Sequence, residues 1–204
     1  MTKLYIIRHG ETVWNAETRA QGAKNIQLNE KGLLQAQHLG KRMKNYSIDA
    51  IYSSDLDRAL STAQAVAKEF QYKVNIIPEL REMSFGHWEG LTNREIQEKH
   101  LTHYRIWRSK PHEAQIPGAE KLLDVQSRGL AALHRIVEEN PNKNVAVVSH
   151  GTAIKAILLG LMDMDLSNFY RIRQDNACIN VVEFREYGPV IVTMNDTAHL
   201  ENTL

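Results

Sequence analysis

Cysteine is almost absent from this chain of 204 residues, which contains a single one, Cys178. One cysteine cannot form a disulfide within the chain, so the sequence excludes the disulfide-dense class of small secreted domains. Long hydrophobic runs are also missing. The N-terminal run LYII is too brief for a signal peptide, and no run approaches the roughly 20 residues that span a membrane. These absences predict a cytoplasmic protein that does not bind membranes.

An excess of charge of one sign is also lacking. The 25 basic and 24 acidic residues give a formal net charge of +1. Nucleic acids and anionic membranes are therefore not expected as partners, and any anion must be held by charges gathered at one place. The length and the hydrophobic content of 43% suffice for one substantial core, so we predict a single domain over residues 1–204. The sequence leaves open whether the chain is a monomer or a homodimer.

Apolar runs and amphipathic patterns alternate along the chain. They predict helices at 29–45, with Asn29 as N-cap, and at 54–70, opened by Ser54 or Asp55. The other predicted helices and the predicted strands are helices 92–100, 120–139 and 152–162, and strands 3–7, 49–54, 72–78, 144–151, 179–184 and 189–195. This alternation predicts an α/β fold, a three-layer α/β/α sandwich whose central sheet is mainly parallel with an antiparallel edge.

Two of the predicted strands end alike. LYII runs into Arg8-His9-Gly10, and VAVV runs into Ser149-His150-Gly151. Basic side chains at the end of a buried strand are costly unless an anion meets them. Ligands of parallel sheets bind beyond the carboxyl ends of the strands. If the two strands are neighbours, both imidazoles therefore project into one crevice.

Four motifs in order resemble those of the histidine phosphatase superfamily, in the branch of cofactor-dependent phosphoglycerate mutase and its small phosphatase relatives. They are RHGET followed by Trp14-Asn15, SSDLDRALSTA, ELREMSFGHWEG, and SHG after a strand. The resemblance covers nearly the whole chain, and the length is closest to the broad-specificity and α-ribazole phosphatase group. It implies a phosphoglycerate mutase-like fold and hydrolysis of small phosphomonoesters through a phosphohistidine, without a metal ion or other cofactor.

Side-chain chemistry agrees with the roles that this resemblance implies. A neutral imidazole is a competent nucleophile near pH 7, and adjacent arginines lower its pKa, so we expect His9 to be the nucleophile. Guanidinium groups match phosphate oxygens, so we expect Arg8 and Arg58 to clamp the phosphoryl group. His150 is expected to stabilise the transition state.

The proton donor to the leaving oxygen is expected in the ELRE segment. The family's position for it is Glu82, with Glu79 as a rival three residues away. The resemblance also places Asn15, Gln21 and Gly22 around the phosphate. Gly151 opens the helix after the SHG motif, and we expect backbone amides there to face the anion.

Residues from about 92 to 122 form the least regular part of the chain, and the resemblance implies a cap or lid over the site. Its aromatic and basic side chains either contact the non-phosphate part of a substrate or anchor the cap; they are Tyr104, Arg105, Trp107 and Arg108. The chain departs from the family's common Gly-Glu-Ser at Lys121, where relatives often carry the serine.

Three other functions compete with a phosphatase. A phosphoglycerate mutase is one, although mutases of this type carry a longer insertion between the ELRE segment and SHG. A noncatalytic module that binds a phosphorylated partner is another, disfavoured because no motif residue is missing. His9 and His150 could instead bind a metal ion, but no third ligand stands at a spacing typical of zinc sites.

Overall fold

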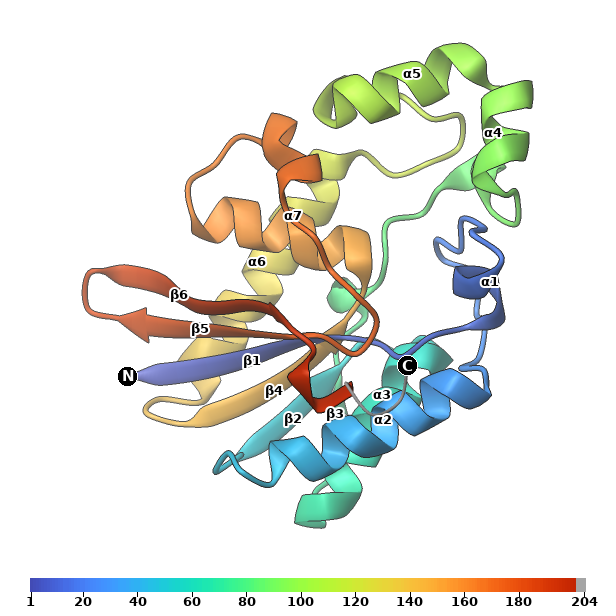
Figure 1. The fold of residues 1–204 in the computed structure, drawn as a ribbon. Helices are drawn as coiled ribbons and strands as arrows, with labels where there is room; N and C mark the ends of the chain where they lie inside the picture. The colour runs from blue at the N-terminus through green and yellow to red at the C-terminus, as the bar shows by residue number, and fades with distance from the viewer. Residues whose placement is uncertain (201–204) are drawn as a thin grey trace.

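The computed structural model describes residues 1–200, which fold around one six-stranded sheet in the order β3-β2-β4-β1-β5-β6 (Figure 1). Four neighbouring strands are parallel, and β5 and β6 add the antiparallel edge. The strands are β1 (Thr2–Arg8), β2 (Ala50–Ser53), β3 (Val74–Ile76), β4 (Asn144–Ser149), β5 (Ile179–Arg185) and β6 (Gly188–Asp196). The predicted mainly parallel sheet with an antiparallel edge is confirmed.

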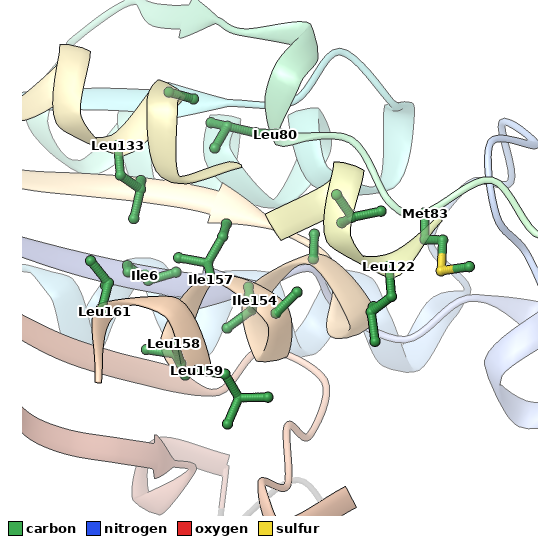
Figure 2. Close-up of a cluster of buried hydrophobic side chains, with 14 of the residues drawn as sticks. Ile6, Leu80, Met83, Leu122, Leu133, Ile154, Ile157, Leu158, Leu159 and Leu161 are labelled. Carbon is green, nitrogen blue, oxygen red and sulfur yellow. The ribbon is translucent and has the colours of Figure 1, made fainter. Parts of the chain in front are cut away.

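Helices cover both faces of this sheet. Figure 1 shows α2 (Glu30–Met43) and α3 (Asp57–Phe70) below it, and α6 (Leu122–Glu139) and α7 (Gly151–Leu161) above it. Side chains alternate along a strand, so β1 supplies both cores. Leu4 and Ile6 belong to the core under α6 and α7, seen in Figure 2, whereas Tyr5 and Ile7 belong to the core over α2 and α3.

Most predicted boundaries lie within a few residues of the observed ones, and Asn29 is the N-cap of α2, accepting the Gly32 amide at 2.7 Å. The predicted opening of α3 was wrong. The helix begins at Asp57, and its N-cap residue makes no side-chain cap. Ser54 and Asp55 form tertiary contacts instead, because the hydroxyl bonds to His150 and the carboxylate pairs with Arg81.

The segment between 92 and 122 contains more helix than its sequence suggested. It holds α4 (Asn93–Lys99), which was predicted, and α5 (Leu101–Ser109), which was not. Tyr104 and Trp107, three residues apart, are the signal for α5, and only Trp107 is buried on it. The remaining short elements are α1 (Val13–Ala16), η1 (Pro78–Leu80), η2 (Gly86–Trp88), η3 (Pro111–Glu113), η4 (Leu166–Arg171) and η5 (Ala198–Leu200).

Strand register decides what meets at the carboxyl edge of the sheet. β1 and β4 are parallel neighbours, with Arg8 opposite Ser149. The residue that follows each of these two strands is a histidine, so the imidazoles of His9 and His150 lie next to each other at this edge of the sheet.

Within residues 1–200, no helix has the length and apolarity needed to cross a membrane.

Candidate active site

The carboxyl edge of the sheet holds a small hollow of about 140 Å³. The ring centroids of His9 and His150 lie 5.1 Å apart beside it. The side chains around it come from segments far apart in the sequence: Arg8, His9, Asn15, Arg19, Ala20, Gln21, Gly22, Arg58, Glu82 and Phe85. Folding therefore brings together seven of the nine residues that the sequence pointed to. Gly151 lines the adjoining hollow, whereas His150 is fully buried and lines neither hollow.

His9 has a fixed tautomer. Its Nδ1 lies 2.7 Å from the carbonyl oxygen of Gly10, which can only accept a hydrogen bond, so Nδ1 carries the proton. The lone pair is then on Nε2. A neutral ring with an unprotonated Nε2 is the form that can attack an electrophile.

Burial keeps both site histidines neutral. Desolvation is the main cause that lowers the pKa of His9 well below 6.5, and the charges of Arg58 and Arg8 lower it further. His150 is held neutral in the same way, by burial first and then by Arg58. The sequence predicted that the arginines would lower the pKa of His9; burial contributes more than they do.

This lowering predicts that stability falls as the pH drops below 6.5. Above 6.5 the two histidines are neutral in both the folded and the unfolded state and add no pH dependence. Below 6.5 the unfolded state binds protons first, so each histidine reduces the free energy of unfolding by up to about 1.4 kcal/mol per pH unit until its folded pKa is reached.

Urea unfolding between about pH 7.5 and about pH 5.5 measures this slope. A His9→Asn variant removes one of the two groups, so its unfolding free energy should decline less steeply over this range. An identical slope in both proteins would contradict the assignment.

Arg58 is a fully buried cation that connects the loop of Gly22 and Lys24 to His150. Its Nη1 and Nη2 donate to the carbonyls of Lys24 and Gly22 at 2.7 and 2.8 Å, and its Nε donates to His150 Nδ1 at 3.2 Å. The second nitrogen of His150 is 2.7 Å from the Ser54 hydroxyl. Burial lowers the pKa of Arg58 to about 10, so it remains charged at neutral pH.

Gly22 turns its loop with φ of +54°, a conformation that favours glycine. A Cβ there would lie 2.1 Å from Glu89 Oε1. A larger residue at this position would strain the loop that brings the Gly22 carbonyl to Arg58.

Arg8 lines the hollow, and its guanidinium has an unpaired donor. Its Nη1 donates to the carbonyl of Gln174 at 2.6 Å, while its buried Nε has no hydrogen-bond partner among residues 1–200. Buried donors are nearly always paired, so an unpaired one beside a hollow indicates a missing acceptor. An anion in the hollow would supply that acceptor.

Asn15 lines the hollow, and its amide oxygen is fully engaged in hydrogen bonds. The oxygen accepts from the backbone and hydroxyl of Thr12, each at 3.1 Å, and from Asn176 Nδ2 at 3.2 Å. Asn176 also donates to the carbonyls of His9 and Gly10. Sequence reasoning missed Asn176, which stands in a loop before β5 with no periodic pattern around it.

Glu82 is the carboxylate of the hollow. Its Oε1 accepts the amides of Met83 and Ala153 at 2.9 and 3.0 Å, and its Oε2 accepts the amide of Thr152 at 3.1 Å. The expectation that amides opening α7 face the anion was therefore wrong for Thr152 and Ala153, because they orient Glu82. The rival Glu79 pairs with Arg135 at 3.5 Å and is absent from the hollow's lining.

Within residues 1–200 there is no group of three histidine, cysteine, aspartate or glutamate side chains arranged to hold a metal ion. Cys178 is fully buried, and burial raises the pKa of its thiol to about 11.

Curated relatives match almost the whole chain. Phosphoserine phosphatase 1 of Hydrogenobacter thermophilus is 34% identical over 200 residues, covering 98% of this chain and 95% of the relative. A metal-independent phosphoserine phosphatase of Arabidopsis thaliana is 35% identical, with coverage of 99% and 84%. A probable phosphoglycerate mutase GpmB of Salmonella choleraesuis is 31% identical, with coverage of 98% and 96%.

Solved structures give the same picture. A phosphoserine phosphatase mutant of Entamoeba histolytica, in complex with phosphoserine, has a TM-score of 0.90 at 34% identity and covers 98% of this chain and 100% of its own. A putative α-ribazole-5′-P phosphatase of Escherichia coli has a TM-score of 0.87 at 29% identity, with 96% of each chain covered. The neighbours thus include the α-ribazole group that the sequence resembled.

A family model matches residues 4–197 of the chain, the model of the histidine phosphatase superfamily (branch 1). The match includes all four motifs and every residue of the hollow. With relatives above 30% identity along nearly the full length, the noncatalytic alternative gives way to an enzyme, a phosphatase that hydrolyses phosphoric monoesters. The chain therefore belongs to the histidine phosphatase superfamily.

Proposed function

We propose that this phosphatase acts through a phosphohistidine on Nε2 of His9. The observation that carries the proposal is the ring's tautomer: Nδ1 is bound to the Gly10 carbonyl, and Nε2 has its lone pair beside a hollow whose lining includes Arg8 and Arg58. Arg8 and Arg58 neutralise the charge of the phosphoryl oxygens. His150 stabilises the transition state from beside His9, and its contact with Arg58 holds that guanidinium in place.

In the first step, Nε2 of His9 bonds to phosphorus while the bond from phosphorus to the ester oxygen breaks. That oxygen takes a proton from the carboxyl group of Glu82 and leaves as an alcohol. In the second step, Glu82 accepts a proton from water, the water oxygen bonds to phosphorus, and the phosphorus–nitrogen bond breaks. The guanidinium groups of Arg8 and Arg58 supply the positive charge, so we propose that neither step needs a metal ion.

We propose that the chain is a single domain in which residues 92–122 form a cap over the site. We also propose that the substrate is a small monoester of the phosphoserine type. Trp107 anchors the cap, since it is buried and its ring centroid lies 5.7 Å from that of Phe85 and 5.4 Å from that of Phe169. Tyr104 and Arg108 line hollows beside the phosphate site, whereas Arg105 lines neither of these hollows. Two phosphoserine phosphatase relatives above 30% identity support the substrate class.

A substrate panel without added metal tests this function. We expect phosphate release from phosphoserine with a higher kcat/KM than from α-ribazole phosphate or sugar phosphates. A faster α-ribazole reaction would overturn the substrate class and leave the phosphatase intact. The GpmB relative makes a mutase the second candidate. Interconversion of phosphoglycerates without phosphate release from any monoester would favour it.

Arg128 on α6 is a positioning residue for Glu82. All five N–H groups of its guanidinium are used: two bind the carboxylate of Glu120 at 2.7 and 2.9 Å, and the others bind backbone carbonyls. Those carbonyls belong to Glu79, Arg81 and Glu82, at 2.6, 2.8 and 3.2 Å. The loop that carries Glu82 is therefore fixed from behind by one side chain.

Replacing Arg128 with methionine should loosen that loop and weaken proton donation. We expect kcat to fall at least about tenfold for alkyl phosphates, which need a proton, and far less for aryl phosphates. KM should change little. Arg135→Met is the matched control, because Arg135 lies on the same helix and, within residues 1–200, forms an ion pair only with the exposed Glu79. Equal losses for both substrate types would show a merely structural role.

A further inference from the structure

A second hollow of about 270 Å³ adjoins the phosphate site and shares Arg8, Glu82 and Phe85 with it. Its other walls come from the first turns of α7 and from α5 and η4. Because Glu82 lies between the two hollows, the group leaving a phosphate held at His9 would point into the second one. Its chemistry therefore bears on which leaving group the enzyme accepts.

Besides Arg8, which also borders the phosphate site, two cations line this second hollow without a carboxylate partner. Lys155 projects from α7 and Arg108 from α5, and neither forms an ion pair within residues 1–200. Their partners are aromatic rings: Lys155 Nζ lies 4.8 Å from the centroid of Phe169, and Arg108 Cζ lies 4.5 Å from that of Tyr170. Aromatic rings orient a cation but do not neutralise it.

Lys155 is the more confined of the two. It is half-buried, and burial together with the charge of Arg8 lowers its pKa. Charged groups removed from water are normally paired with an opposite charge. Across both hollows, the unpaired cations are Arg8, Arg58, Arg108 and Lys155, against the single carboxylate of Glu82. A phosphate group bound at His9 would still leave the positive charges of Lys155 and Arg108 in the second hollow without a counter-charge.

We propose that Lys155 and Arg108 form a subsite for a carboxylate on the leaving group, so that the enzyme selects phosphomonoesters that carry one. This inference rests on the proposed function, because the subsite has a role only if the ester is cleaved at His9. Ammonium and guanidinium groups bind carboxylates by charge-assisted hydrogen bonds, which are about twice as strong as neutral ones. An uncharged leaving group would leave both cations unpaired.

Two pairs of substrates isolate the carboxylate. Phosphoserine differs from phosphoethanolamine only by this group, and 3-phosphoglycerate differs from glycerol 3-phosphate by a carboxylate in place of a hydroxymethyl group. We expect the wild-type protein to favour the carboxylated member of each pair at least about tenfold in kcat/KM. Lys155→Met and Arg108→Met should each reduce that preference severalfold, mainly through KM, and the double variant should bring it close to one.

Arg105→Met is the matched control, because Arg105 lies on α5 but lines neither hollow. It should keep the wild-type preference. Equal kcat/KM values within both pairs for the wild type, with phosphate still released, would overturn the subsite and leave the proposed function standing. Equal losses on both members of a pair in Lys155→Met would also overturn it. Absence of phosphate release from all four esters and from an aryl phosphate would overturn the proposed function itself.

Discussion

A His9→Asn protein should lose at least about 10⁴-fold in kcat on every phosphomonoester, the scale seen when an enzyme's nucleophile is removed. Asparagine keeps an N–H that can donate to the Gly10 carbonyl, as His9 Nδ1 does, so the local fold has a replacement for that bond. It offers no lone pair at the position of Nε2. Steady-state phosphate release from an aryl phosphate measures the loss.

Binding must survive for this loss to be assigned to chemistry. Arg8 and Arg58 remain in the variant, so inorganic phosphate should still raise its thermal midpoint, since any ligand that binds the folded state stabilises it. A variant that no longer responds to phosphate would mean that the site has collapsed. Retention of even one tenth of wild-type turnover would mean that His9 is not the nucleophile.

A Glu82→Gln protein should separate two kinds of substrate. The alkoxide of an alkyl phosphate is a poor leaving group and needs a proton, so kcat for alkyl phosphates should fall about 10²- to 10⁴-fold. The phenolate of an aryl phosphate leaves without protonation, so kcat for aryl phosphates should fall much less. Glutamine keeps an oxygen that can accept from the Thr152 or Ala153 amide, so the position of the side chain is nearly preserved.

Glu79→Gln is the control for this experiment. Glu79 is the other carboxylate of the ELRE segment, and it pairs with Arg135 instead of lining the hollow. Its substitution should leave both substrate classes near wild-type rates. A Glu79 variant with the larger loss on alkyl phosphates would reverse the assignment of the proton donor.

The two histidine motifs could be paired from the sequence because each follows a recognisable strand. Parallel neighbours place their carboxyl ends together, so Arg8, His9 and His150 meet by register alone. The antiparallel edge was readable from two apolar runs, 179–184 and 189–195, with only a few residues between them, and the structure places the turn at Glu186 and Tyr187. The choice of Glu82 over Glu79 came from resemblance, and the tertiary contacts of Arg135 and of the α7 amides now give its physical reason.

Residues that hold other residues could not be read in the same way. Ser54 looked like a helix cap, yet its hydroxyl serves a histidine 96 positions later. Arg128 sits on an amphipathic helix like any surface arginine, and its role depends on carbonyls 46 to 49 positions earlier. Lys155 stands within an apolar helix where nothing in its neighbours marks a hollow. Such contacts depend on loop geometry, which no local periodicity encodes.

The central claim is that phosphorus is transferred to Nε2 of His9, and rapid chemical quenching tests it most directly. Enzyme mixed with ³²P-labelled substrate and quenched in alkali within milliseconds should carry label in an acid-labile, alkali-stable bond, and peptide mapping should place that label on His9. The His9→Asn protein should carry none. A wild-type enzyme that turns over but never acquires label on His9, even when product release is slowed, would contradict the account.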